Sequence, residues 1–570
     1  MDDPQVAQLA GLVDQGKLSR RNVLSIGLKL GIATPVLLGL MAKAPETLAA
    51  PVSQLESFRQ RLQDGGSGTF TALISSSADD ADPHSTYSTI GSMICLPCYE
   101  MLIRYKGDSV SDYEPMLAQS WEMNADNTEA TFTLFENVQF HDGTPCDATA
   151  VKSSLTRLVK MEKGPYLVLA RFVPDPDNQI QVVDAKTVTF TFTQPQPLFL
   201  AAMASSYGPL IVSPTAVEEN KTDDDPWANQ WVMFNAVGTG PYKMTQNDMS
   251  EGAKYEKFEE FHGGWDGNHF DSVFYRVVPE SSTRRQLIES GEADATAYNL
   301  TPDDVEALRQ DPRVVVEEYP TTRINWVIMN AVKLNTQARQ GFSYAFPYDE
   351  VMNGAYTGLL TRSGPIPDSV IGFDPNVFIY QTDLAKAKEL VLAAGFAEGD
   401  SFDYYVDSSD EVENTVAQLF QANVQQMGFN LEISSIDAAT IESMVFGDSP
   451  AEERPFFVGG WEWWPDYNDP WNMLAPNFLI EAAGGGGDNG GFYKNDRFEE
   501  LMAQAKDVTD TNQLDEIMKE CQSILTEQDP PVIYLGQTRM YTVLIPQIQG
   551  FLSNPLYLET YFPYTLSRAQ

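Results

Sequence analysis

The sequence predicts an α/β protein of several structural units, and three observations support this prediction. The chain has 570 residues, of which 43% are hydrophobic and 11% aromatic, so it can bury more than one core. Its second half alternates strand-like and helix-like patterns, which is typical of a parallel sheet with crossover helices. Its first half holds short alternating segments separated by turns, which predicts an additional β-rich subdomain.

The β-rich part begins with a strand predicted over residues 69–75. Residues 130–134 alternate between apolar and polar side chains, as expected of a half-buried strand, and residues 187–192 repeat the alternation. Between these strands Asp147 can cap a helix whose apolar positions share one face. These positions are Val151, Leu155 and Leu158.

The second half contains the pattern of a βαβ unit. Thr382 can cap a helix with an apolar stripe, and Gly395 suits the position after its C-terminus. Residues 402–406 then alternate as a strand, residues 412–427 show helical spacing, and residues 429–433 alternate again. Such a unit predicts two parallel neighbouring strands joined by a right-handed crossover.

The charge balance excludes two classes of partner. The chain has 80 Asp and Glu against 37 Lys and Arg, which gives a formal net charge of −43. Nucleic acids and anionic membrane surfaces both require a basic face, so neither is an expected partner. The acidity is typical of a protein kept soluble by self-repulsion. The four cysteines do not predict a disulfide framework in a chain of this length.

The N-terminus has the pattern of an export signal. Arg20 and Arg21 precede an apolar run over residues 24–42, and small residues follow at 47–50. The paired arginines resemble the twin-arginine type of signal. An uncleaved membrane anchor is the alternative, although Lys29 interrupts the apolar run.

We therefore predict that residues 1–50 are a twin-arginine-type signal, cleaved near Ala49 or Ala50, and that residues 51–67 are a linker. The protein is expected to be exported to a periplasmic or extracellular location, with a membrane tether as the alternative if the signal stays in place.

A tryptophan-rich segment is the strongest functional signal in the chain. Residues 456–458 read as a buried strand that runs directly into residues 459–471, which hold four tryptophans, Tyr467 and the aspartates Asp466 and Asp469. Ligands of open α/β sheets bind beyond the carboxyl ends of strands, in clefts with aromatic walls and a few polar groups. A carboxylate there can bind an ammonium group, and indoles can stack on a sugar or a cation. The alternative is that the tryptophans pack in the interior of one structural unit and that Asp469 only makes a turn.

Patterns of common enzymes are missing from the sequence. None of the four histidines belongs to a His-Glu-x-x-His motif, and neither a Gly-x-Ser-x-Gly elbow nor a dinucleotide fingerprint is present. Asp466 and Asp469 could form a glycosidase pair, but such carboxylates usually come from separate elements. His141 and His262 are interpreted as turn residues. We predict no enzymatic activity, no cofactor and no metal site.

Several short motifs, in order, carry a resemblance to a known family. Together with the tryptophan-rich segment they make the chain similar to the family 5 extracellular solute-binding proteins, the group of dipeptide- and oligopeptide-binding proteins, over about residues 68–570. The motifs are Tyr99–Tyr105, Leu117–Trp121, Val138–Pro145, Gly238–Lys243, Ser290–Asp294 and Ala385–Leu390.

This resemblance implies a two-lobe fold of the type II periplasmic-binding-protein kind, with an extra β-rich subdomain in the first lobe and closure by a hinge. The crossing segments are expected near 318–323 and 536–539. The implied parts are lobe I over 68–318, with the extra subdomain at about 116–235, lobe II over 319–537, and a return segment of lobe I over 538–570.

The resemblance also implies roles for particular residues. Asp466 matches the acid that forms a salt bridge with the α-amino group of a peptide, and Trp463 and Trp464 match residues that line the pocket. Trp461 and Tyr467 are expected to extend the aromatic wall. Glu100 matches an acid at the pocket edge.

One departure from the family keeps a second ligand class open. Pro465 stands where a small residue is usual, and the segment is rich in tryptophan, so an oligosaccharide is the alternative to a peptide. A nickel or haem carrier and a receptor that signals to a sensor are further alternatives. The implied partners are a small ligand and the permease of an ABC importer, and the protein is expected to act as a monomer.

Overall fold

The computed structural model describes residues 68–569, apart from residues 79, 298, 299, 448, 485, 486, 507 and 509. The predicted export signal and linker, residues 1–67, lie outside this part. Within it, no helix combines the length and the apolar character needed to cross a membrane.

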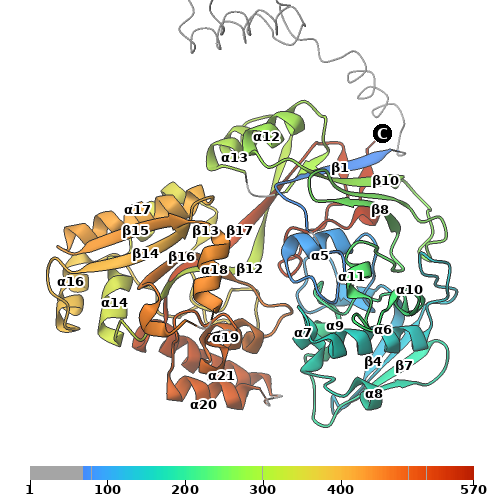
Figure 1. Ribbon diagram of the computed structural model, residues 1–570, viewed down its shortest axis with the longest axis horizontal. Coiled ribbons are helices and arrows are strands. Elements are labelled where there is room, and N and C mark those ends of the chain that lie inside the picture. Colours follow the sequence, from blue (N-terminus) through green and yellow to red (C-terminus); the bar gives the residue numbers. More distant parts are fainter. Residues whose placement is uncertain are drawn as a thin grey trace, which may run out of the picture. The chain divides into compact units, whose positions relative to one another are not determined.

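An eleven-stranded sheet connects the two groups of elements seen in Figure 1, which we call the first and second lobes. Its strands lie in the order β15-β14-β16-β12-β17-β11-β1-β10-β9-β8, and β13 pairs with β17. At its centre the long strands β12 (Val315–Met329) and β17 (Val532–Leu544) pair antiparallel.

The pairing of β12 with β17 is interrupted where the two lobes meet. Pro320 pairs with Arg539 and the next regular pair is Ile324 with Gln537, so residues 321–323 have no regular partner. Inside this break the Thr321 hydroxyl donates a 2.6 Å hydrogen bond to the carbonyl of Thr538. The break coincides with the places where the sequence predicts the two crossing segments.

The first lobe is built around β1 (Thr69–Ile74), which lies between two parallel neighbours, β10 and β11. This strand was predicted from its sequence. The other elements of this half are β2 (Ile103–Tyr105), β3 (Tyr113–Pro115), β8 (Tyr242–Asp248), β9 (Gly252–Lys257), β10 (Ser272–Val277), β11 (Ala295–Thr296), α5 (Thr89–Cys95), α12 (Ser281–Glu289) and α13 (Pro302–Arg309).

A separate antiparallel sheet, in the order β4-β5-β7-β6, lies within residues 118–191. Asp147 caps α6 by accepting a hydrogen bond from the amide of Ala150, as predicted. The elements of this region are β4 (Ala118–Met123), β5 (Glu129–Leu134), β6 (Ile180–Val182), β7 (Thr187–Thr191), α6 (Ala148–Met161), α7 (Tyr166–Ala170), α8 (Pro176–Gln179), α9 (Phe199–Met203), α10 (Pro214–Asn220) and α11 (Asn229–Val232).

The second lobe contains the predicted βαβ unit. Strands β14 and β15 pair parallel, and α17 connects them. The helix predicted after Thr382 is α16, but Asp383 rather than Thr382 is its cap, because the Asp383 carboxylate accepts from the amide of Lys386. The elements are β13 (Leu360–Thr361), β14 (Ser401–Asp407), β15 (Asn430–Ile436), β16 (Phe457–Trp463), α14 (Thr336–Ala345), α15 (Tyr348–Glu350), α16 (Leu384–Ala393), α17 (Glu411–Gln426), α18 (Ala438–Phe446), α19 (Pro470–Phe478), α20 (Asp496–Ala505) and α21 (Thr511–Ser523).

Each lobe buries its own apolar side chains. One large cluster gathers residues of the first lobe with residues 541–566, so the end of the chain packs on the first lobe. There the short strands β18 (Ile548–Gln549) and β19 (Ser567–Arg568) pair. Two further clusters lie on opposite faces of the second-lobe strands, since neighbouring side chains of a strand point to opposite faces. Tyr467 belongs to the first-lobe cluster although it follows β16 of the second lobe.

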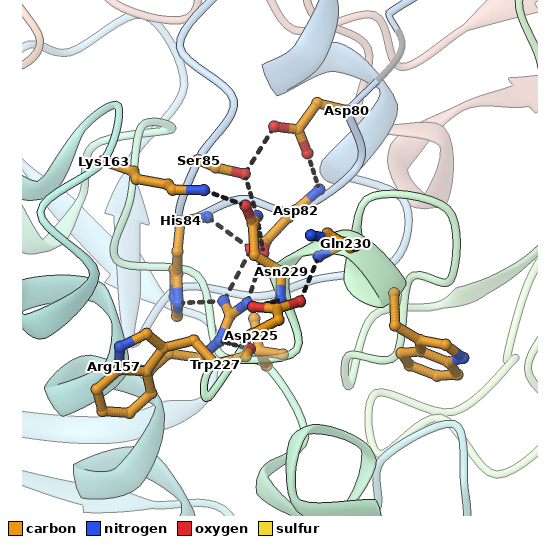
Figure 2. A network of polar contacts seen from close by, with 12 residues as sticks. Asp80, Asp82, His84, Ser85, Arg157, Lys163, Asp225, Trp227, Asn229 and Gln230 are labelled. Carbon is orange, nitrogen blue, oxygen red and sulfur yellow. Dashed lines mark hydrogen bonds and ion pairs between the residues drawn. The ribbon is translucent and has the colours of Figure 1, made fainter. Parts of the chain in front are cut away.

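A buried polar network fixes the segment between β1 and α5 (Figure 2). The guanidinium group of Arg157 donates to both carboxylate oxygens of Asp82, and Asn229 donates to the same carboxylate at 2.8 Å. Burial alone would raise the pKa of Asp82, but the bonds from Arg157 and Asn229 lower it. Asp82 is therefore ionised and paired inside the first lobe.

His84 completes the network as a neutral side chain. Burial, followed by the charge of Arg157, lowers its pKa to about 3. Because Arg157 can only donate, Nδ1 of His84 accepts its 2.9 Å bond, and Nε2 donates to the carbonyl of Leu210 at 3.0 Å. The network holds the backbone immediately before Tyr87, a residue of the candidate site.

Replacing Arg157 by methionine should strongly destabilise the protein. The substitution leaves the Asp82 carboxylate buried without a cation, which typically costs about 3–5 kcal/mol. Urea unfolding of the Arg157→Met variant should show this loss. Lys160→Met on the same helix is the control, because Lys160 is exposed and pairs only with an exposed Asp177, and its effect should stay within about 0.5 kcal/mol. Equal stability of the two variants would contradict the role given to Arg157.

Candidate ligand-binding site

Strand β16 extends further into the tryptophan-rich segment than the sequence indicates. It continues to Trp463, with a bulge at Gly459 and Gly460, and Gly460 has a φ of 72° that favours glycine. Because side chains alternate along a strand, Trp461 and Trp463 point to the same face. Both pack, half-buried, against the second-lobe core beside Trp326 and Ile324, their partners on β12.

Asp466 lies beyond the end of β16 with its carboxylate buried. The hydroxyl of Tyr87 donates to one oxygen at 2.7 Å, and the side-chain amide of Asn472 donates to the other at 3.0 Å. Asn472 also accepts from the Asp466 amide at 2.7 Å, so the first turn of α19 sets the orientation of the acid. The Asp466 backbone carbonyl accepts from Ser205 of the first lobe at 2.8 Å.

The charge of Asp466 is not neutralised by a cation in the described part of the chain. The acid is only 7% exposed, and burial raises its pKa to about 6 despite the bonds from Tyr87 and Asn472. The half-buried Asp488 has a pKa raised to about 7, first by burial and then by the charge of Asp466. Two acids thus face one region without a positive partner, which is an arrangement that can bind an ammonium group.

Aromatic rings from both lobes lie near Asp466. Tyr87 is 46% exposed and meets Tyr207 edge to face, with ring centroids 5.5 Å apart. Trp464 packs against the first-lobe core, and the guanidinium group of Arg323, in the break of the central sheet, lies 4.6 Å from its ring centroid. Trp464 is therefore placed between the lobes, unlike Trp461 and Trp463.

The residues after Asp466 hold the lobes together. Tyr467 is buried in the first-lobe core, and its hydroxyl accepts from Arg171 at 3.0 Å. Asp469 caps α19 by accepting from the amide of Trp471 and forms an ion pair with Arg171. The guanidinium group of Arg171 also lies 4.5 Å from the ring centroid of Trp471. The segment therefore spans from the second lobe to the first.

Glu100 lies apart from these residues. Its carboxylate forms 3.0 Å hydrogen bonds with Nε2 of His262, and the charge of Glu100 raises the pKa of His262 against the effect of burial. The pair lies in a cavity of about 450 Å³ in the first lobe whose lining includes neither Asp466 nor any tryptophan. The structure thus groups Asp466, Trp464 and Tyr467 at the junction of the lobes and leaves Glu100 outside.

Sequence reasoning did not identify Tyr87, Asp488 or Arg171. Tyr87 and Arg171 reach the site from segments about three hundred or more residues before Asp466, so no local pattern links them. Asp488 lies in the glycine-rich tract 484–491, where a single acid among glycines is a weak signal. Within the described residues, no group of three or more His, Cys, Asp and Glu side chains could hold a metal ion.

Comparison with known proteins identifies the family. The sequence profile described as "Bacterial extracellular solute-binding proteins, family 5 Middle" matches residues 112–484. The chain belongs to this family. It is a solute-binding protein, and the resemblance inferred from its short motifs is confirmed.

Curated relatives of this solute-binding protein bind different ligands. It is 29% identical to the probable D,D-dipeptide-binding periplasmic protein DdpA of Escherichia coli K12, over 85% of this chain and 92% of DdpA. It is 24% identical to the dipeptide-binding protein of the same organism, over 81% and 87% of the two chains. It is also 24% identical to heme-binding protein A of Haemophilus influenzae, over 81% of this chain and 86% of that protein.

Solved structures establish the fold of the solute-binding protein. The binding protein DppA from Helicobacter pylori, in complex with the peptide STSA, matches with a TM-score of 0.75 at 22% identity, over 90% of this chain and all of that chain. NikZ from Campylobacter jejuni, in complex with Ni(L-His), matches with a TM-score of 0.75 at 17% identity, over 88% and 99%. The predicted two-lobe fold of the type II periplasmic-binding-protein kind is confirmed.

The ionisation of Asp466 should lower the stability of the ligand-free protein as pH rises. Its pKa of about 6 lies above the 3.8 of an exposed aspartate, so ionisation in the folded state costs about 3 kcal/mol above that pKa. The contribution of Asp466 to the free energy of unfolding is fully present below about pH 4 and is lost as the pH rises through about 6. The variant Asp466→Asn has no such loss, since the Tyr87 hydroxyl can accept from the new amide.

Urea unfolding at about pH 5 and about pH 8 measures this effect. The stability of Asp466→Asn relative to the wild type should increase between the two pH values, by about 1–2 kcal/mol. Asp126→Asn, at an exposed turn, is the control and should show no such increase. A pH-independent difference for Asp466→Asn would mean that the acid is not buried as described.

Proposed function

We propose that the protein captures a di- or oligopeptide between its two lobes, binds the peptide's α-ammonium group to Asp466, and delivers the peptide unchanged to the permease of an ABC importer. The observation that carries this proposal is the buried Asp466 carboxylate at the junction of two lobes, which pairs with no cation in the part of the chain that the structure describes. An ammonium group would replace the missing cation, and burial strengthens such an interaction because the dielectric is low.

The contacts between the lobes support a closing mechanism. Strands β12 and β17 cross between the lobes, and their ladder is interrupted at the crossing. We propose lobe I over 68–318, lobe II over 319–537 and a return segment over 538–570, with rotation at the interruption. A ligand that contacts both lobes favours the closed state by its difference in affinity for the two states.

The relatives favour a peptide over an oligosaccharide. Two of the relatives described above are named for dipeptides, and the H. pylori protein was solved with a peptide. An oligosaccharide would need exposed indole faces, but Trp461 and Trp463 pack on the second-lobe core. The segment 459–471 also supplies backbone groups beside Asp466, to which an extended peptide can pair as an added strand.

The family supports an extracytoplasmic location and a binding role without catalysis. An exported binding protein needs a signal, and residues 1–50 are proposed to be a twin-arginine-type signal. The proposed membrane partner is the permease of an ABC importer, and the protein is proposed to act as a monomer, which the mass of the protein in solution measures.

Loss of the Asp466 charge should weaken peptide binding. Asp466→Asn keeps the shape of the side chain but leaves a bound ammonium group without its partner, which typically costs about 2–5 kcal/mol, or about 30- to 5,000-fold in Kd. Titration calorimetry with L-alanyl-L-alanine and longer alanine peptides measures the change, and Asp126→Asn should bind as the wild type does. N-acetylated peptides, which have no ammonium group, should bind the wild type poorly. Equal affinity of wild type and Asp466→Asn would contradict the proposal.

A further inference from the structure

A second cavity lies beside the break in the central sheet, on the other face of β16 from Trp461 and Trp463. Its volume is about 280 Å³, slightly below the range of about 300–1,000 Å³ usual for pockets that hold a whole small ligand. Leu300 and Val305 of the first lobe, Arg323 and Thr538 of the crossing strands, and Tyr356 of the second lobe contribute to its walls. The cavity therefore suits one part of a ligand that is held between the lobes.

Three carboxyl groups line this cavity. Glu462 lies on β16, next to Asn325 of β12, whose side-chain amide donates to it at 3.2 Å. Asp410 caps α17 by accepting from the Glu413 amide at 2.9 Å. Glu413, in the first turn of α17, accepts a hydrogen bond from the Tyr356 hydroxyl.

Among the described residues, the positive groups of the cavity pair with Glu462 but not with Asp410 or Glu413. Arg323 forms ion pairs with Glu462 at 3.1 Å and Glu559 at 2.8 Å, and it stacks on Trp464. Arg539 also lines the cavity, but among the described residues it forms no ion pair with Asp410 or Glu413. Burial, followed by the charge of Asp410, raises the pKa of Glu413 to about 8.

Glu413 carries the observation that points to a ligand. The side chain lines the cavity, the residue is 3% exposed, and its Oε2 atom is buried without a hydrogen-bond partner, although the Gly460 amide lies near the carboxyl group. A buried acceptor without a donor normally costs about 1–3 kcal/mol.

The position of Glu413 three residues after an Asp cap matches a capping box. In that motif the acid would bond back to the Asp410 amide. No such bond occurs in the described residues, so helix capping does not account for the orientation of Glu413.

We propose that this cavity is a subsite for the basic side chain, lysine or arginine, of the peptide whose ammonium group binds Asp466. The proposal rests on the proposed function. The donors of an ammonium or guanidinium group would satisfy Glu413 Oε2 and compensate the charge of Asp410. A bare metal ion is a poor occupant, because no group of His, Cys, Asp and Glu in the described residues could hold one.

The distance along the chain fits a short peptide. Glu462 lines the cavity and Asp466 follows four residues later, so their Cα atoms are at most about 14 Å apart. Trp464 lies between them and contacts Arg323, which belongs to the cavity wall. This separation is within the reach of a dipeptide or tripeptide that has its N-terminus at Asp466 and carries a lysine side chain.

Calorimetric titration of the full protein with matched peptides tests this proposal. The peptides are L-alanyl-L-lysine, L-alanyl-L-norleucine and L-alanyl-L-glutamate, and the corresponding tripeptides with a second alanine. Norleucine has the same aliphatic stem as lysine without the charge. A lysine peptide of either length should bind at least about tenfold more tightly than its norleucine and glutamate counterparts, and equal affinities at both lengths would overturn the proposal.

Substitution of the acids separates this subsite from the Asp466 site. Glu413→Gln keeps the bond with Tyr356 and removes the charge, so the preference for lysine over norleucine should fall to less than about threefold, while the affinity for the norleucine peptide stays within about twofold. Asp410→Asn, which can still cap α17, should reduce the preference in the same direction. Glu432→Gln, at an exposed position of β15, is the matched control and should keep the full preference.

The outcomes distinguish the two proposals. If the wild type binds none of the peptides, the proposed function fails. If it binds them all, requires Asp466, and shows no preference for lysine, only the subsite is wrong. The subsite is also contradicted if Glu413→Gln and Asp410→Asn both keep the preference for lysine peptides. Their unfolding midpoints must show in that case that both variants are folded.

Discussion

The structure depends on one electrostatic constraint, the burial of the Asp466 carboxylate where two lobes meet, with no positive group of the described residues to balance it. Burial raises its pKa to about 6, and the nearby Asp488 is raised further. The buried carboxylate of Asp82, in contrast, is compensated, because Arg157 and Asn229 donate hydrogen bonds to it. Under the proposed function a ligand supplies the missing cation at Asp466, since an unpaired buried charge is otherwise only a cost to stability.

The surrounding structure keeps this acid in place from both sides. Asn472 at the start of α19 orients Asp466 from the second lobe, and Tyr87 reaches it from the first. The segment that carries Tyr87 is fixed by the network in Figure 2, and the ion pair of Arg171 with Asp469 fixes the segment that carries Asp466. Under the proposed function, binding and closure are connected, because the side chains proposed to contact the ligand are the ones that join the lobes.

The sequence predicted the elements whose patterns are local. Strands β5 and β14 and helix α17 appear where alternation or helical spacing indicated them, because burial of one face sets both patterns. The cap of α16 was assigned one residue too early, since Thr382 and Asp383 can both cap a helix.

The candidate site was predicted less completely, because it is assembled from distant segments. Asp466, Trp464 and Tyr467 lie at the junction of the lobes, but Trp461 and Trp463 face the second-lobe core, since β16 continues through a glycine bulge that resembles the end of a strand. Tyr87, which contacts Asp466 across 379 positions of sequence, has no local pattern that could reveal it.

A crystal structure of the protein with a bound dipeptide tests the central claim most directly. The account predicts that the α-ammonium nitrogen lies within about 3.2 Å of the Asp466 carboxylate and that the peptide contacts residues of both lobes. A peptide bound within one lobe, or with its ammonium group remote from Asp466, would contradict it.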